Sequence, residues 1–286
     1  MLSKIGKWKI IAIESGNFKL DGGAMMGSVP KVLWNKTNPA DKLNRIDLAM
    51  RCVLLDDGEN IVLIETGIGN KFDTKFSSIF EINNKSNTLS DTLQLYGYIH
   101  SNVTHVIMTH LHFDHSGGAT TIDDNGELIT TFPNAKYYIS NKNWLAALNP
   151  NLRDKASYLK ENFIPIELNG QLELIEGNTE ILPGLSTHEA NGHTSGQQLV
   201  KIDSMGETLL FCGDLIPLRS HLNPPFIMGY DLNASKTLEE KIDLLDLASK
   251  NEWWLWFYHD PKTIAVKVRK NTNSKYEVIK EVLKSN

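Results

Sequence analysis

The residues most able to do chemistry lie in one short run, Thr109-His110-Leu111-His112-Phe113-Asp114-His115. Three imidazoles and one carboxylate fall within six consecutive positions of it. Histidines this close repel one another when they are protonated, so the cluster is costly to keep unless a cation binds it. Neutral imidazole nitrogens and ionised carboxylate oxygens are good ligands for divalent metals, and zinc suits this set well. The run therefore predicts a metal site.

The spacing within the run indicates ligands for two neighbouring ions. His110 and His112 alternate with Leu111, so in extended backbone they point to the same side. Asp114 and His115 are adjacent, and they cannot both share that direction unless the chain turns sharply. A histidine-rich surface loop or an expression-tag remnant is the alternative. The mid-chain position, the acidic residue and the spacing all argue against it.

A predicted buried strand precedes the run, so a rigid sheet can hold these ligands at its end. Runs rich in apolar and β-branched residues predict further strands, and helical spacing of apolar residues predicts helices. The predicted strands are Trp8–Glu14, Leu48–Leu55, Ile61–Thr66, Val103–Met108, Lys136–Ser140, Gln171–Ile175, Thr179–Leu182, Gln198–Ile202, Thr208–Cys212 and Trp253–Tyr258, and the predicted helices are Ser90–Ser101, Asn141–Leu148 and Thr237–Lys250. Strands and helices mixed without strict βαβ alternation imply an α/β fold with two mixed sheets and helices outside. No Pro-, Gly- or Ser-rich linker divides the chain, which predicts a single domain over residues 1–286.

The composition is that of an ordinary globular protein, with 41% hydrophobic and 22% charged residues. The net charge of −5 and the lack of a basic run argue against nucleic-acid binding, and Lys267–Lys270 is expected to be a solvated cluster. The apolar part of the N-terminus is too short and too interrupted by lysine for a signal peptide or a membrane span. Cys52 and Cys212 lie in apolar, strand-like runs, which predicts buried free thiols and fits a cytoplasmic protein.

Three later residues share the context of the first run, a strand end followed by a turn. His193 lies in Asn191–Gly196, where glycines allow a tight approach of the backbone. Asp214 follows the strand predicted at Thr208–Cys212, and His259 follows Trp253–Tyr258. A single histidine at a strand end is more often a hydrogen-bonded core or surface residue than a ligand. Together with the first run, however, these residues supply the seven ligands that two metals would need.

The ordered set His-x-His-x-Asp-His, Gly-His-Thr, Gly-Asp and a late His resembles the metallo-β-lactamase superfamily over essentially the whole chain. That resemblance implies an αββα sandwich with two metals at one edge of its sheets. It also implies the ligands, residue by residue: His110, His112 and His193 for the first metal, Asp114, His115 and His259 for the second, and Asp214 bridging them. Two Zn²⁺ ions are expected, with manganese, cobalt or iron as alternatives.

Two further segments, Phe18–Trp34 and Gly213–Pro217, narrow the resemblance. They are similar to the branch that holds quorum-quenching N-acyl-homoserine lactonases and organophosphate hydrolases such as methyl parathion hydrolase, and look closest to the YtnP-like lactonases. This branch implies a small-molecule lactone or related ester as substrate. Because related lactonases are often dimers, it also implies a homodimer.

Three positions depart from the family pattern. Glu65-Thr66-Gly67 stands where members often have Asp-Thr-Gly, and the longer carboxylate could still orient a ligand histidine. Ser195-Gly196-Gln197 follows Gly-His-Thr, where many members have Pro-Gly-His. Pro217 stands where some lactonases place a catalytic tyrosine, so another group, or the metal alone, must polarise the substrate carbonyl.

The expected mechanism is hydrolysis by a hydroxide that two adjacent divalent ions generate from water. Asp114 is the predicted carrier of the proton to the leaving group. His221, seven residues after Asp214, is predicted to contact substrate, with a surface-loop histidine as the equal alternative. Apolar residues are predicted either to line a substrate pocket or to pack in the core; these are Met25, Met26, Trp34, Phe113, Phe226 and Met228.

Several other functions compete with lactone hydrolysis. A phosphotriesterase or another ester hydrolase would use the same hydroxide, and a β-lactamase is less favoured by the N-terminal segment. Diiron relatives that reduce oxygen usually carry a flavodoxin domain and a glutamate in the ligand run, and this chain has neither. A nuclease would need an inserted domain or a basic surface. The non-enzyme alternative is a metal-stabilised binding protein, which the complete ligand set disfavours.

Overall fold

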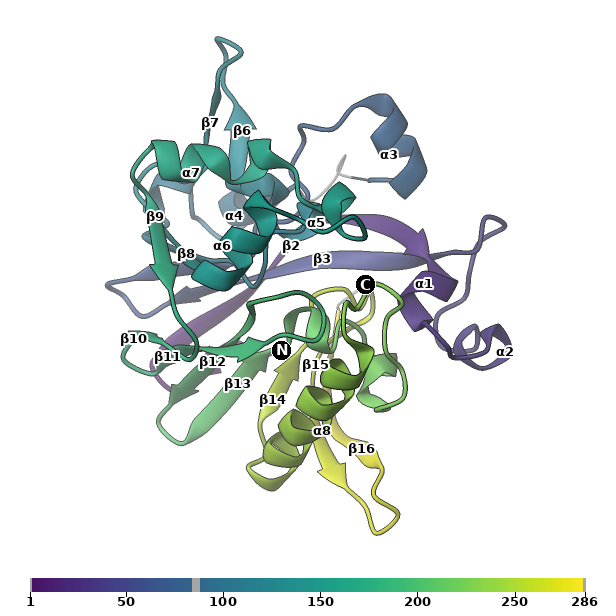
Figure 1. Ribbon diagram of the computed structural model, residues 1–286. Coiled ribbons are helices and arrows are strands. Elements are labelled where there is room, and N and C mark those ends of the chain that lie inside the picture. Colours follow the sequence, from purple (N-terminus) through teal and green to yellow (C-terminus); the bar gives the residue numbers. More distant parts are fainter. Residues whose placement is uncertain (1, 84–87, 285–286) are drawn as a thin grey trace.

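The computed structural model describes residues 2–83 and 88–284 and contains two seven-stranded sheets (Figure 1). In spatial order, the first sheet consists of β1 (Lys4–Ile5), β2 (Trp8–Asp21), β3 (Arg45–Asp56), β4 (Ile61–Ile64), β5 (His105–Ile107), β8 (Lys136–Ser140) and β9 (Leu172–Ile175). The second consists of β10 (Glu180–Leu182), β11 (Leu185–Ala190), β12 (Gln197–Ser204), β13 (Glu207–Phe211), β14 (Trp254–Trp256), β15 (Thr263–Lys270) and β16 (Tyr276–Leu283). A separate hairpin is formed by β6 (Thr120–Ile122) and β7 (Leu128–Thr130).

Both sheets are mixed, and the parallel strands β5, β13 and β14 precede predicted ligands, whereas His193 follows the antiparallel strand β11. In the first sheet β4, β5, β8 and β9 run parallel to one another, and in the second sheet β13 runs parallel to β14. The remaining pairs are antiparallel. Buried apolar runs such as Ile61–Ile64 and Trp254–Trp256 suit strands that are covered on both faces.

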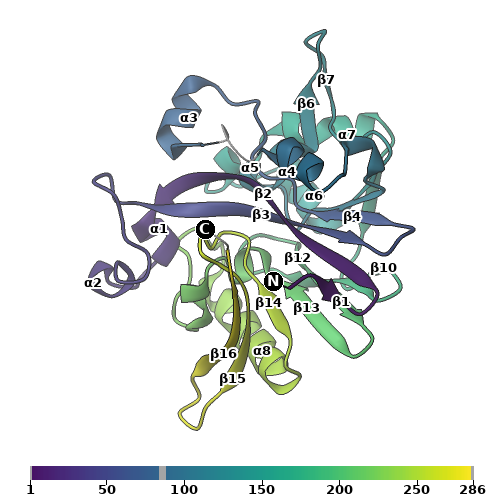
Figure 2. The same cartoon turned by 180° about the vertical axis from the view of Figure 1, so that it is seen from behind.

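Helices flank the two sheets. The longest, α8 (Ala234–Lys250), lies against β15 and covers the second sheet, as Figures 1 and 2 show from opposite sides. The shorter helices are α1 (Gly22–Met26), α2 (Lys31–Trp34), α3 (Thr74–Phe80), α4 (Leu89–Leu95), α5 (Phe113–Ser116), α6 (Asn141–Leu148) and α7 (Ile164–Leu168). This arrangement confirms the predicted αββα sandwich of two mixed sheets. The single-domain organisation of residues 1–286 stays a prediction.

The two sheets are joined by backbone hydrogen bonds at the edge where the predicted ligands lie. Gln198 N, in β12, donates to Thr109 O at 2.9 Å. On the other side, Ala49 N and Arg51 N, both in β3, donate to His259 O at 2.9 Å and to Tyr258 O at 3.1 Å. The loops that carry ligand candidates are therefore fixed to the opposite sheet as well as to their own.

Most predicted elements are present, and the differences have local causes. β8 and α6 have the predicted bounds, whereas the helix predicted over Ser90–Ser101 ends at Leu95, two residues before Gly97, which has a positive φ of 83°. The prediction for Lys267–Lys270 is wrong in part, because these residues belong to β15 and Val268 is buried. Both cysteines are free and buried, as predicted.

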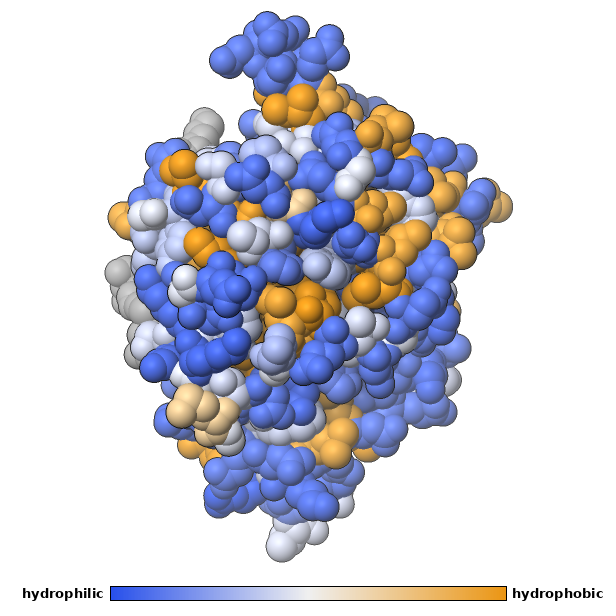
Figure 3. All heavy atoms as spheres, turned by 90° about the vertical axis from the view of Figure 1, so that its left-hand side faces the viewer, coloured by the Kyte–Doolittle hydropathy of each residue, from blue (hydrophilic) through white to orange (hydrophobic). Residues whose placement is uncertain are grey.

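The face of the molecule drawn in Figure 3 is mainly hydrophilic. Figure 3 shows one face with scattered apolar patches, and the hydrophilic projection at its top is the β6–β7 hairpin. Within residues 2–83 and 88–284, no helix is both long enough and apolar enough to cross a membrane.

Arg51 is a buried cation that ties the two sheets together. Its Nε donates to Glu14 Oε1 at 2.6 Å, and its Nη1 donates to the backbone oxygens of Asp260 and Thr263 at 2.7 and 3.2 Å. Arg51 is fully buried, so these acceptors lose their partner if the guanidinium is removed. Asp260 directly follows His259, which links this buried cation to the predicted site.

We expect Arg51→Met to lower the free energy of unfolding by about 1–3 kcal/mol, because the buried carbonyl oxygens of Asp260 and Thr263 lose their donor, whereas Glu14 keeps its ion pair with Lys284. Lys7→Met is the control, since it removes an ion pair with Asp57 in which Lys7 is 44% exposed. That change should cost less than about 1 kcal/mol. Urea unfolding measures both, and equal costs for the two variants would contradict the role given to Arg51.

Candidate metal centre

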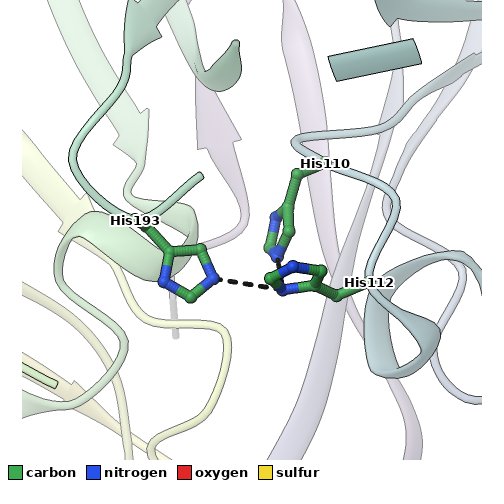
Figure 4. Close-up of side chains that lie close together, drawn as sticks. All are labelled: His110, His112 and His193. Atoms are coloured by element: carbon green, nitrogen blue, oxygen red, sulfur yellow. Dashed lines mark hydrogen bonds between the residues drawn. The ribbon is translucent and has the colours of Figure 1, made fainter. Parts of the chain in front are cut away.

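Three histidines from two loops converge at the edge where the sheets meet (Figure 4). His110 and His112 lie in the loop after β5, and His193 lies in the loop between β11 and β12. His112 Nδ1 is 3.0 Å from His110 Nε2 and 3.2 Å from His193 Nε2. These nitrogens therefore face one small volume from both sheets.

A second group lies beside the first. It consists of Asp114 and His115, both in α5, and His259, which follows β14. Asp114 Oδ2 is 3.5 Å from His259 Nε2 and 3.8 Å from His115 Nε2. The turn into α5 after His112 changes the direction of the chain, so that Asp114 faces His259 and His115 faces Asp214.

Asp214 lies between the two groups, in a short 3₁₀ turn after β13 (Gly213–Leu215). Its Oδ2 is 3.4 Å from His193 Nε2, on the side of the first group. Its Oδ1 is 3.3 Å from His259 Nε2 and 3.4 Å from His115 Nε2, on the side of the second. The carboxylate thus presents one oxygen to each group, which is the position of a bridging ligand.

These side chains are chemically suited to hold cations. The pKa values of His110 and His112 lie well below the usual value, first because of burial and then because of neighbouring imidazoles, so both rings are neutral. Burial opposes ionisation of Asp214, but His115 and His259 outweigh it and hold its pKa well below the usual range. His115 Nε2 and Asp214 Oδ1 are buried and have no hydrogen-bond partner among the described residues. A cation between them would supply the missing partner.

Groups behind the ligand candidates fix the orientation of their rings. Asp231 Oδ1 accepts a hydrogen bond from His193 Nδ1 at 2.9 Å, and Ala49 O accepts one from His259 Nδ1 at 2.9 Å. With Nδ1 protonated in each ring, the Nε2 lone pair faces the cluster. Sequence reasoning missed Asp231, because it lies in an irregular segment before α8 and no spacing connects it to His193.

Glu65, the departure from the family's usual aspartate, also lies behind the cluster. It is fully buried, accepts a hydrogen bond from Thr109 N at 2.9 Å, and has Oε1 3.4 Å from His115 Nδ1. Its backbone has a φ of 67°, a left-handed conformation that is rare outside glycine. The glutamate side chain, which is longer than that of aspartate, therefore contacts both Thr109 and His115.

Pro217 has a backbone role in this site. Its carbonyl oxygen accepts a hydrogen bond from His259 N at 3.1 Å. On the opposite side, the Tyr258 hydroxyl donates to Asp114 O at 2.6 Å. The segment after β13 and the end of β14 thus hold the backbone of two ligand candidates, although proline itself offers no side-chain donor.

A cavity of about 200 Å³ opens onto the cluster. Its polar wall includes His112, Asp114, His193, Asp214 and His259. Its apolar wall includes three of the predicted pocket residues, Met25, Phe113 and Met228. Two others, Met26 and Trp34, are core residues, and Phe226 packs against the core. Residues that the sequence did not single out complete the lining: Leu20, Phe80, Arg153, Asp154, Ala156, Ser157, Gly229 and Tyr230.

His221 occupies a different place from the one predicted. It lies in a 3₁₀ turn (Arg219–Leu222), is 1% exposed, and does not line this cavity. Its Nε2 donates to Met25 O at 2.9 Å, and burial lowers the pKa of His221 to about 3. The ring therefore supports the backbone of a cavity residue, and neither direct contact with substrate nor the surface-loop alternative describes its position.

Comparison with known proteins agrees with this geometry. The model of the metallo-beta-lactamase superfamily matches residues 48–257. The chain belongs to the metallo-beta-lactamase superfamily. An N-acyl homoserine lactonase of Bacillus thuringiensis is 28% identical over 267 residues, which cover 88% of this chain and 93% of that protein. Another from a Bacillus species is 27% identical over 212 residues, or 69% of this chain and 78% of that one.

Solved structures of this superfamily share the fold. A probable metal-dependent hydrolase from Staphylococcus aureus matches with a TM-score of 0.90 and 30% identity, covering 99% of both chains. AidC, a dizinc quorum-quenching lactonase, matches with a TM-score of 0.80 at 20% identity over 99% of this chain and 97% of that one, which shows the fold alone. As a superfamily member with these relatives, the protein is a metal-dependent hydrolase.

We expect Asp231→Asn to weaken metal binding by about 10–100-fold, because groups that orient ligand histidines contribute that much to affinity. The substitution keeps the size of the side chain but removes its charge from His193. Competition with a chromogenic chelator measures the effect, and Asp124→Asn, on the exposed tip of the β6–β7 hairpin, is the control. Equal affinities of the Asp231 variant and the wild type would contradict the role of Asp231.

Proposed function

We propose that this enzyme holds two zinc ions and uses them to hydrolyse a lactone or a related ester. The observation that carries the proposal is the cavity, in which the candidate ligands form one wall and Met25, Phe113 and Met228 form an apolar wall. Such a cavity suits a small molecule that carries a reactive carbonyl and an apolar substituent. The curated relatives named N-acyl homoserine lactonase support this substrate class.

His110, His112 and His193 would hold one ion, and Asp114, His115 and His259 the other. Asp214 would bridge the two, since its oxygens face different groups. When bound, a pair of divalent ions lowers the pKa of water and so supplies hydroxide at neutral pH. Zinc fits a set of imidazoles and carboxylates, and manganese, cobalt or iron are the alternatives that reconstitution would distinguish.

Asp114 is the group best placed to move a proton. It is 7% exposed, lines the cavity, and its Oδ2 lies 3.5 Å from His259 Nε2. Its backbone is fixed by the hydrogen bond from the Tyr258 hydroxyl to Asp114 O. In this position Asp114 can take the proton that the nucleophile loses and pass it to the alkoxide that leaves when the ester bond breaks.

The second candidate function is hydrolysis of a phosphotriester or another ester by the same groups. Pro217 is the observation that favours this second function. Because residue 217 is not a tyrosine, no phenol at that position can polarise a lactone carbonyl. The small-molecule substrate and the absence of a nucleic-acid partner are parts of the same proposal. The homodimer stays a prediction.

A substrate panel tests the proposed function. It contains acyl-homoserine lactones of varied chain length, a paraoxon-type phosphotriester and a chromogenic β-lactam. We expect ring opening of the lactones, its loss after chelation, and its return when zinc is added. Phosphotriester turnover without lactone opening would replace the leading substrate class with the second candidate. Activity that survives complete removal of metal would contradict the proposal as a whole.

We expect Asp114→Asn to lower kcat by about 10²–10⁴-fold, the usual contribution of a positioned proton carrier. The amide has nearly the same size as the carboxylate but cannot take up the proton. Metal content must be measured alongside the rate, because Asp114 is also a ligand candidate. A variant that keeps both ions and the wild-type kcat would remove Asp114 from the proton path.

A further inference from the structure

One hydroxyl in the wall of the cavity is used by neither the candidate ligands nor the groups that support them. Tyr230 lines the cavity together with Asp114 and His259. It is 38% exposed, so a molecule that enters the cavity can contact its side chain. Its hydroxyl forms no hydrogen bond with any residue in the ranges 2–83 and 88–284. The cavity wall therefore contains a donor that is left for a ligand.

Two other phenols lie beside the ligand cluster, and both are occupied. The Tyr258 hydroxyl donates to Asp114 O at 2.6 Å, and Tyr258 is fully buried. The Tyr158 hydroxyl lies 2.6 Å from Thr194 Oγ1, and Tyr158 is 6% exposed. Neither residue lines the cavity. Of these three tyrosines, Tyr230 is the one whose hydroxyl a substrate can use.

The backbone on both sides of Tyr230 is held in place. Gly229 N donates to Ala24 O, in α1, at 2.7 Å. On the other side, Asp231 Oδ1 accepts the hydrogen bond from His193 Nδ1 at 2.9 Å. Tyr230 is thus fixed between the helix that contributes to the apolar wall and a residue that supports a ligand candidate. The scissile bond of a substrate lies at the same border when its apolar part contacts the apolar wall.

The surroundings of the hydroxyl keep it protonated. Burial raises the pKa of Tyr230, and the carboxylates of Asp21 and Asp114 raise it further. The phenol is therefore a hydrogen-bond donor at neutral pH. Asp114 lines the same cavity and, as the proposed proton carrier, must reach the oxygen that leaves. A phenol that is close enough to Asp114 to be affected by its charge lies on the side where this oxygen is released.

We propose that the Tyr230 hydroxyl donates a hydrogen bond to the ester oxygen that leaves when the scissile bond breaks. In this reaction the oxygen of water bonds to the carbonyl carbon, and the bond from that carbon to the ester oxygen breaks. The electron pair of the broken bond stays on the ester oxygen, which receives a proton of the water through Asp114. Tyr230 keeps its own proton and stabilises the negative charge until that proton arrives. The inference rests on the proposed ester hydrolysis and adds a catalytic residue to it.

The test removes only the hydroxyl, with Tyr230→Phe, and compares two substrates that differ in their leaving oxygen. An aliphatic lactone releases an alkoxide, whereas a p-nitrophenyl ester releases a phenolate that spreads the charge over its ring. We expect kcat for the lactone to fall by about 10–100-fold, the value of a hydrogen bond to a charged group. For the aryl ester the loss should be about fivefold or less, because less charge stays on the leaving oxygen. KM for the lactone should keep its wild-type value, since the charge develops only as the bond breaks.

Tyr96→Phe is the matched control, because Tyr96 is 42% exposed and does not line the cavity. It should keep the wild-type kcat for both substrates. Melting temperature and bound metal are measured for both variants. Neither quantity should change in Tyr230→Phe, since the hydroxyl that it removes has no partner among the described residues.

A lactone kcat that Tyr230→Phe leaves unchanged would overturn the assignment of Tyr230 and leave the proposed function standing. Equal losses for the two substrates would mean that the hydroxyl acts on a different oxygen, and would overturn the assignment as well. Failure of the wild type to open the lactone would overturn both the assignment and the proposed function.

Discussion

His112 Nδ1 lies 3.0 Å from one imidazole nitrogen and 3.2 Å from another, in a site from which water is almost excluded. Each of these contacts needs one protonated nitrogen as the donor, unless a cation lies between the two lone pairs instead. Asp214 contacts both histidine groups, with one oxygen facing His193 and the other facing His115. Much of the rest of the structure can be understood as a means of bringing these groups together and fixing their directions.

The fold meets this requirement by joining two sheets at the ends of their parallel strands. The segment after β5 carries four ligand candidates, while the turns after β13 and β14 carry Asp214 and His259. Gln198, in the second sheet, donates a hydrogen bond to Thr109 in the loop after β5, and Ala49, in the first sheet, donates one to His259. Each sheet thus fixes a loop of the other sheet that carries candidate ligands. Buried Arg51 then connects β3 to the segment just after His259. The loops that carry the candidate ligands are thus anchored to rigid strands, which fixes the distances between the ligand atoms.

Six of the seven candidate ligands stand out in the sequence because they follow an apolar strand, β5, β13 or β14. His193 follows β11, whose sequence LSTHEA is not an apolar run. Strands and helices such as β8, α6 and α8 were predictable from the periodic spacing of their apolar residues. The terminal strands β15 and β16 fall outside the prediction, although at least half of the residues in each are apolar. In the structure β15 pairs with β14, and β16 pairs with β15. Asp231, which supports His193, lies in an irregular segment, where only the folded chain shows what it faces. His221 could not be placed from sequence, because its spacing from Asp214 says nothing about the Met25 carbonyl that it contacts.

The central claim is that seven side chains of this chain form one site for two metal ions. Anomalous diffraction at the zinc edge, from crystals of the protein purified with zinc, tests it directly. We expect two peaks, each about 2.0–2.2 Å from its nitrogen and oxygen ligands. One should lie among His110, His112 and His193, and the other among Asp114, His115 and His259, with Asp214 between them. A single peak in a fully active enzyme, or peaks away from these residues, would contradict the account.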